Sequence, residues 1–181
     1  IYLPEYGPRK KDKNAPPFSN DIKSFKESVL QSLVDIRIAG EILKNEDLVD
    51  KNKLQLGGLS LGALMTAISA GMDPFFDRYL IGLGGGDLAN AMTIEKKKTF
   101  GVIREALQNI DWNVDFARKE LSDFDALTWA YTVHHKKFIF LSAENDELVD
   151  LDKSVMKLIN AYKENGNSVV HYKHKGSHVP L

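Results

Sequence analysis

The pentapeptide Gly58–Gly62, Gly-Leu-Ser-Leu-Gly, has the residue types and spacing of a serine nucleophile. A short apolar run, residues 53–56, precedes it and a small-residue stretch, residues 63–70, follows it, which predicts a strand, a sharp turn and a helix. Such a turn lifts the serine hydroxyl clear of the sheet, and we expect a Cβ at Gly58 or Gly62 to collide with neighbouring backbone. The pattern therefore predicts that Ser60 is a catalytic nucleophile.

A serine hydroxyl becomes a good nucleophile only when a base takes its proton and an acid orients that base. Asp146 follows the predicted strand 138–141, and His178 follows the predicted strand 168–172. Both lie in loops at the carboxyl ends of strands, which a parallel sheet brings to the edge that carries Ser60. We therefore expect Asp146 to be the acid and His178 the base.

Each of these two roles has rivals in the sequence. For the acid, the neighbouring alternatives are Glu144, Glu147 and Asp150. For the base, the alternatives are His134 and His135, at the amino end of a strand, and His171 and His174, on or beside the last strand. A metal site at His171, His174 and His178 is not favoured, because a spacing of three along a strand points side chains to opposite faces. We expect no metal and no cofactor.

The elements that must position these residues alternate along the chain. Strands are predicted at residues 1–4, 53–56, 79–83, 138–141 and 168–172, and helices at residues 21–45, 63–70 (closed by Gly71) and 155–162 (closed by Gly166). This alternation predicts an α/β fold with a mainly parallel sheet and helices on both faces. Residues 93–130 show no strand signal and are predicted to be a small helical cap insertion. The triple glycine at 84–86 is interpreted as flexible backbone lining the cleft, in preference to a phosphate-binding loop.

The length and composition of the chain limit the classes of function that can be expected. The 181 residues fit one domain, and a net charge of −1 offers no bulk attraction for nucleic acid or an anionic membrane. The apolar stretch 54–72 is interpreted as a buried strand, turn and helix, so no membrane span is predicted. The chain begins at Ile1, so a leader sequence cannot be judged; a soluble protein is expected, with the cytoplasm favoured. The oligomeric state is not indicated.

These motifs together resemble the α/β-hydrolase superfamily, close to its bacterial esterase and peptidase-like branches. The resemblance is carried by Gly58–Gly62, by Asn145–Val149 and by Gly176–His178, in the order Ser, Asp, His that the family uses. Leu3–Gly7 resembles the family's oxyanion loop. The resemblance covers nearly the whole chain, from the family's third strand to its histidine loop. It implies one domain, residues 1–181, from which the family's first two strands and last helix are absent.

The resemblance implies a serine hydrolase that cleaves an ester, thioester or amide of a small acyl substrate through an acyl-enzyme intermediate. The oxyanion hole would use the backbone N–H of Leu61 and a second N–H from Tyr6 or Gly7, since Pro8 has no N–H to donate. Two alternatives remain: a hydrolase-fold protein that binds a partner or small molecule without chemistry, and an acyltransferase that uses the same triad.

Overall fold

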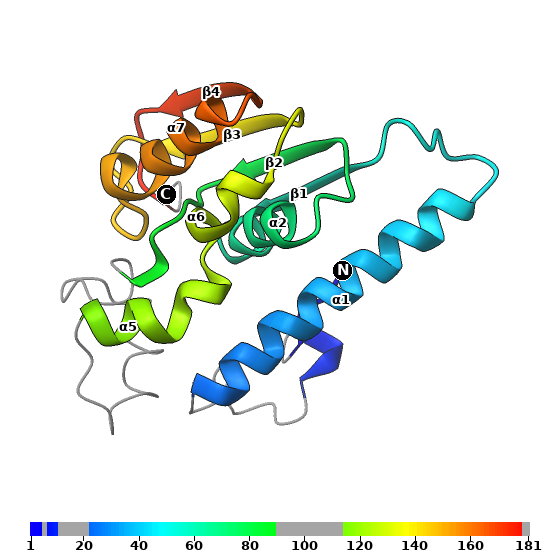
Figure 1. Cartoon of the computed structure of the whole chain (residues 1–181), viewed down its shortest axis with the longest axis horizontal. Helices are drawn as coiled ribbons and strands as arrows, with labels where there is room; N and C mark the ends of the chain where they lie inside the picture. The colour runs from blue at the N-terminus through cyan, green and yellow to red at the C-terminus, as the bar shows by residue number, and fades with distance from the viewer. Residues whose placement is uncertain (5–6, 11–21, 90–113, 179–181) are drawn as a thin grey trace.

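The computed structural model describes residues 1–4, 7–10, 22–89 and 114–178, and a parallel sheet forms its centre (Figure 1). Its four strands lie in the order β1-β2-β3-β4. They are β1 (Gln55–Leu59), β2 (Arg78–Gly82), β3 (Lys137–Ala143) and β4 (Ser168–His174). Every neighbouring pair is parallel, so all four carboxyl ends meet at one edge of the sheet. The predicted parallel α/β sheet is confirmed.

Helices follow the strands in the expected alternation. The α-helices are α1 (Ile22–Asn45), α2 (Leu61–Met72), α5 (Val114–Leu121), α6 (Ala126–Trp129) and α7 (Lys157–Glu164). Segments of other helix types are the 3₁₀ turns η1 (Gly7–Arg9), η2 (Ser122–Phe124) and η3 (Ala130–Thr132) and the π-helical segment η4 (Leu151–Met156). In Figure 1, α2 lies along β1 and β2, α7 lies along β3 and β4, and α1 lies outside α2.

The core lies between the sheet and the α2–α7 layer. Tyr162 of α7 stacks on Phe138 of β3 with ring centroids 4.0 Å apart, and its hydroxyl donates to the Ala67 carbonyl of α2 at 3.4 Å. Burial on the strands has a period of two, because successive side chains point to opposite faces. Phe138 and Phe140 are buried, whereas Ile139 between them is 37% exposed. Among the described residues, helices therefore cover one face of the sheet, whereas the sequence predicted helices on both faces.

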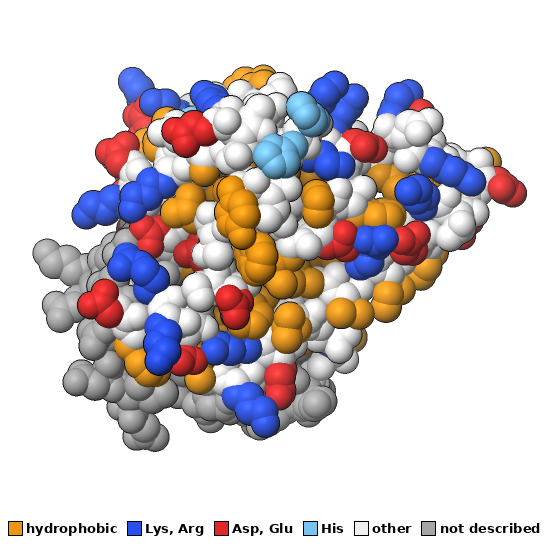
Figure 2. Space-filling view, in the orientation of Figure 1, with side chains coloured by type: hydrophobic (Ala, Val, Ile, Leu, Met, Phe, Trp, Pro, Cys, Tyr) orange, Lys and Arg blue, Asp and Glu red, His pale blue; other side chains and the backbone are white. Residues whose placement is uncertain are grey.

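Helix α1 is apolar on two sides. Phe25, Val29 and Ile36 are buried. The side chains at four-residue spacing on its outer side are 45–57% exposed, and Figure 2 shows hydrophobic atoms along that side of the helix; they are Leu30, Val34, Ile38 and Ile42. The predicted helix is thus confirmed, with more apolar surface than its contact with the rest of the molecule uses.

Several boundaries differ from the sequence-based prediction. Residues 1–4 form no strand. Helix α2 continues through Gly71 to Met72, because Gly71 allows close packing against Trp129 and does not stop the helix. Of the predicted insertion 93–130, residues 93–113 lie outside the described residues, and residues 114–130 contain α5, η2 and α6. In the described part of the chain, no helix is long and apolar enough to cross a membrane.

Candidate active site

The turn between β1 and α2 places Ser60 at the carboxyl edge of the sheet. Ser60 has φ 51° and ψ −113°, a left-handed conformation that is strained for a side chain of this kind. Its N–H donates to the Gly82 carbonyl of the neighbouring strand at 2.8 Å. A Cβ at Gly58 would overlap the Gly62 carbonyl, as expected, but a Cβ at Gly62 would meet open space, so that half of the expectation was wrong.

Ser60, His178 and Asp146 form one hydrogen-bonded chain. Ser60 Oγ lies 2.7 Å from His178 Nε2, and His178 Nδ1 lies 2.8 Å and 3.0 Å from the two Asp146 oxygens. An ionised carboxylate only accepts, so Nδ1 carries the proton and Nε2 is free to accept the serine hydroxyl proton. The side chains of His178 and Asp146 are 5% and 3% exposed, while Ser60 is exposed. This arrangement can make Ser60 a nucleophile.

Backbone pairing between two loops brings Asp146 and His178 together. Beyond the β3–β4 ladder, the Glu144 N–H donates to the His174 carbonyl at 2.9 Å, and the Asn145 N–H donates to the Gly176 carbonyl at 3.0 Å. The loop after β3 therefore follows the loop after β4, as if the sheet continued. One Asp146 oxygen also accepts the N–H groups of Leu148 and Val149, each at 2.8 Å, which fixes the carboxylate.

The rival acids have other contacts. Asp150 caps η4 by accepting the N–H groups of Asp152 and Lys153. Glu147 accepts the backbone N–H of His178 at 3.2 Å and not its ring. Glu144 is exposed on the same loop.

The rival histidines lie elsewhere as well. His171 Nε2 lies 2.7 Å from Ser142 Oγ, and burial lowers the pKa of His171, which favours a neutral ring. His134 Nδ1 lies 3.1 Å from the Asn165 carbonyl, away from the carboxyl edge. Among the described residues, no group of three or more His, Asp or Glu side chains could hold a metal ion.

The oxyanion donors stay predictions. Leu61 is the first residue of α2, where an N–H has no acceptor within the helix and lies at the helix's positive end. Gly7 opens η1 with φ 52°, and Arg9 of η1 forms an ion pair with Asp35 of α1. Tyr6 lies outside the described residues.

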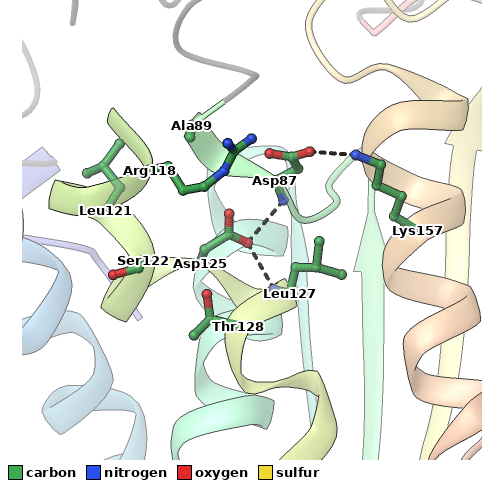
Figure 3. Close-up of a pocket in the computed structure, with 9 residues that line it drawn as sticks. All are labelled: Asp87, Ala89, Arg118, Leu121, Ser122, Asp125, Leu127, Thr128 and Lys157. Atoms are coloured by element: carbon green, nitrogen blue, oxygen red, sulfur yellow. Dashed lines mark hydrogen bonds and ion pairs between the residues drawn. The ribbon is translucent and has the colours of Figure 1, made fainter. Parts of the chain in front are cut away.

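A second polar cluster, which the sequence did not predict, lies beyond the end of β2. Asp125, which caps α6, is 8% exposed and accepts the N–H groups of Asp87, Leu88 and Leu127 at 2.6–3.0 Å. Lys157 of α7 binds the Asp87 carboxylate at 2.8 Å. Asp87, Asp125, Leu127 and Lys157 line a pocket of about 350 Å³, and Figure 3 shows Arg118 among the other residues that line it. The sequence signal that could have indicated this cluster is Asp125 itself, a residue type that commonly caps the start of a helix.

The cluster explains the burial of Asp125 in electrostatic terms. Burial raises the pKa of Asp125; its three backbone N–H donors act in the opposite direction, and the neighbouring Asp87 adds to the increase. The carboxylate connects the loop after β2 to α6, so it stabilises the chain path at the carboxyl edge of the sheet.

The triple glycine serves close packing. A Cβ at Gly84 would meet Ala63 of α2, one at Gly85 would meet Ser154 of η4, and one at Gly86 would meet Leu127 of α6. Positive φ angles fall instead on the flanking residues Leu83 and Asp87. The interpretation of this segment as flexible backbone is therefore replaced by one of tight contact with three elements.

Comparisons with known proteins agree with this architecture. Residues 30–179 match the model of the prolyl oligopeptidase family, a range that contains Ser60, Asp146 and His178 but not Tyr6 or Gly7. No curated protein sequence matches the chain.

Similar solved structures include two peptidases and one esterase. A puromycin-hydrolyzing peptidase of Mycobacterium tuberculosis has a TM-score of 0.64 at 16% identity, over 82% of this chain and 22% of that one. An acylaminoacyl peptidase of Pyrococcus horikoshii has a TM-score of 0.64 at 18% identity, over 84% and 24%. Acetyl xylan esterase 1 of a Thermoanaerobacterium species has a TM-score of 0.64 at 15% identity, over 96% and 52%. The chain thus spans less than a quarter of the two peptidases and about half of the esterase, and the likeness shows the fold.

Proposed function

We propose a serine hydrolase activity for this chain, which belongs to the prolyl oligopeptidase family within the α/β-hydrolase superfamily. In this proposal Ser60 is the nucleophile, His178 the general base and acid, and Asp146 the residue that orients the imidazole. The substrate is an acyl compound: an ester, a thioester or an amide. The single observation that carries the proposal is the hydrogen-bonded chain from Ser60 Oγ through His178 to Asp146.

The reaction follows from that geometry. His178 Nε2 takes the Ser60 proton as Oγ attacks the substrate carbonyl, and Asp146 stabilises the imidazolium through Nδ1–H. The Leu61 N–H at the start of α2, with a second N–H from Tyr6 or Gly7, stabilises the oxyanion. His178 then protonates the leaving group, and a water molecule that it deprotonates releases the acyl group from Ser60. Because Ser60 is exposed, an acyl carbonyl can approach it from solvent.

The proposal predicts that Ser60→Ala lowers kcat by about a thousandfold or more while the protein stays folded, since the group that forms the covalent bond is lost. The assay uses p-nitrophenyl esters of graded acyl length together with an aminoacyl amide, because the similar structures include both an esterase and peptidases. A fluorophosphonate probe should label the unchanged protein and not the variant. Circular dichroism serves as the folding control.

Two other outcomes are informative. Ser60-independent turnover, or no probe labelling of Ser60, would contradict the proposal and favour a hydrolase-fold binding protein. If added alcohols or amines receive the acyl group faster than water does, the same residues serve an acyltransferase.

A further inference from the structure

The proposed triad histidine is held at its backbone as well as at its ring. Asp146 accepts the ring Nδ1–H of His178, and the adjacent Glu147 accepts the backbone N–H of the same residue through Oε2 at 3.2 Å. Two consecutive carboxylates thus contact one histidine at two points. We propose that Glu147 is a positioning residue for His178, an inference that rests on the proposed function.

The local structure gives Asp146 and Glu147 separate tasks. Asp146 is fixed from its own side by the N–H groups of Leu148 and Val149, so its carboxylate has a set direction. The Glu147 side chain instead reaches across to the loop after β4. The backbone bonds from Glu144 and Asn145 bring that loop alongside only as far as Gly176. Glu147 therefore extends the contact between the two loops to His178 itself.

The second contact matters for the position of Nε2. A ring held only at Nδ1 can swing when the backbone behind it shifts, and such a swing lengthens the 2.7 Å contact between Nε2 and Ser60 Oγ. Misplacement of a reacting group by about 1 Å can cost on the order of a hundredfold in rate. Glu147 is exposed, so water can partly replace its carboxylate, and the expected loss is smaller, about three- to tenfold.

Glu147 and Glu144 form a matched pair for the test. Both are exposed glutamates on one loop, but only Glu147 accepts the His178 N–H. Glu147→Ala removes the acceptor and the charge, whereas Glu147→Gln removes the charge and keeps a carbonyl oxygen of similar reach. Glu144→Ala removes a charge from the same loop without touching that bond.

The experiment measures kcat and KM for an ester substrate in these variants, and the exchange rate of the His178 amide proton by NMR. Glu147→Ala should lower kcat about three- to tenfold, leave KM within twofold and speed His178 amide exchange. Glu147→Gln should recover most of kcat and of the protection, and Glu144→Ala should match the unchanged protein. Unchanged kcat and amide exchange in Glu147→Ala, or no recovery in Glu147→Gln, would overturn this inference alone. If the protein without substitutions showed no turnover that depends on Ser60, the proposed function would be overturned instead, and with it the role of Glu147.

Discussion

The turn at Ser60 has a strained backbone that neighbouring residues hold in place. A residue in a sparsely populated backbone conformation costs on the order of 1–3 kcal/mol, and Ser60 with φ 51° is such a residue. The hydrogen bond from its N–H to the Gly82 carbonyl opposes that strain, and the missing side chain at Gly58 leaves room for the Gly62 carbonyl. The two glycines of the motif therefore have unequal roles: Gly58 permits the turn, while Gly62 faces open space.

This difference predicts unequal effects of one methyl group. Gly58→Ala should destabilise the protein by about 3 kcal/mol or more, because its Cβ overlaps backbone that cannot rotate away, and should abolish turnover. Gly62→Ala should be neutral or stabilise by up to about 1 kcal/mol, because alanine favours the helix and its Cβ meets no atom. Urea denaturation measures both effects. Equal destabilisation by the two variants would contradict this account of the turn.

At the residue scale, the sequence was most informative where chemistry and chain order coincide. Ser60, Asp146 and His178 stood out because each has the right residue type and follows a predicted strand, and the structure brings these three together. The packing role of the triple glycine could not be predicted, because the atoms that need the space belong to α2, η4 and α6, all distant in sequence from it. The contact from Glu147 to the His178 backbone likewise depends on how two loops meet.

At the scale of the secondary-structure elements, Asp125 holds a loop and a helix together and takes no part in the proposed reaction. Its carboxylate accepts N–H groups from the loop after β2 and from the first turn of α6, and these contacts are largely removed from water. Burial raises its pKa in the folded protein. Asp125 in the folded protein therefore binds a proton at a higher pH than it does in the unfolded chain. Ionised Asp125 lowers the stability of the folded protein, and this cost disappears as the pH falls through the raised pKa toward the unfolded value of about 3.9.

The sign of this linkage predicts the behaviour of Asp125→Asn. At pH 7 the variant should lose about 1–2 kcal/mol, because its amide group replaces one acceptor oxygen and leaves a buried N–H without a partner. The gap in unfolding free energy between the two proteins should widen as pH falls from 7 to 4, since only the unchanged protein gains from protonation at this site. Other carboxylates titrate in both proteins and cancel in the difference. A gap that narrows at low pH, measured by urea denaturation, would contradict the raised pKa.

Element types were predictable from periodicity, and element ends were less so. The β1 prediction, residues 53–56, falls short of the observed Gln55–Leu59 because Gly57 and Gly58 have weak strand propensity, while pairing with β2 keeps them extended. Gly71 was expected to end α2, but the helix continues because Trp129 packs where a side chain would stand. Both errors have the same cause, since tertiary contacts override local propensity. The cap assignment of residues 93–130 stays a prediction.

At the scale of the whole molecule, the sheet is asymmetric within the residues that the structure describes. On the side of α2 and α7 the strands carry a continuous aromatic and aliphatic core that includes Tyr79, Phe138 and Phe140. On the opposite side Ile139, Val170 and Tyr172 are 37–60% exposed. Register explains the pattern, because Ile139 pairs with Val170 while Phe140 pairs with His171 one residue further along. Apolar side chains on the open face thus lie next to each other and form one surface.

This asymmetry predicts opposite results for one substitution at adjacent positions of β3. Ile139→Thr should change the free energy of unfolding by less than about 1 kcal/mol, because Ile139 is partly in water already and threonine favours strands. It should also reduce binding of the dye ANS, which reports exposed apolar surface. Phe140→Thr should cost about 3–5 kcal/mol, because Phe140 is fully buried and its loss leaves a cavity against the Tyr162 ring. If Ile139→Thr destabilised the protein as much as Phe140→Thr, both faces of the sheet would have to be covered in solution, and the apolar surface on the open face would have a partner.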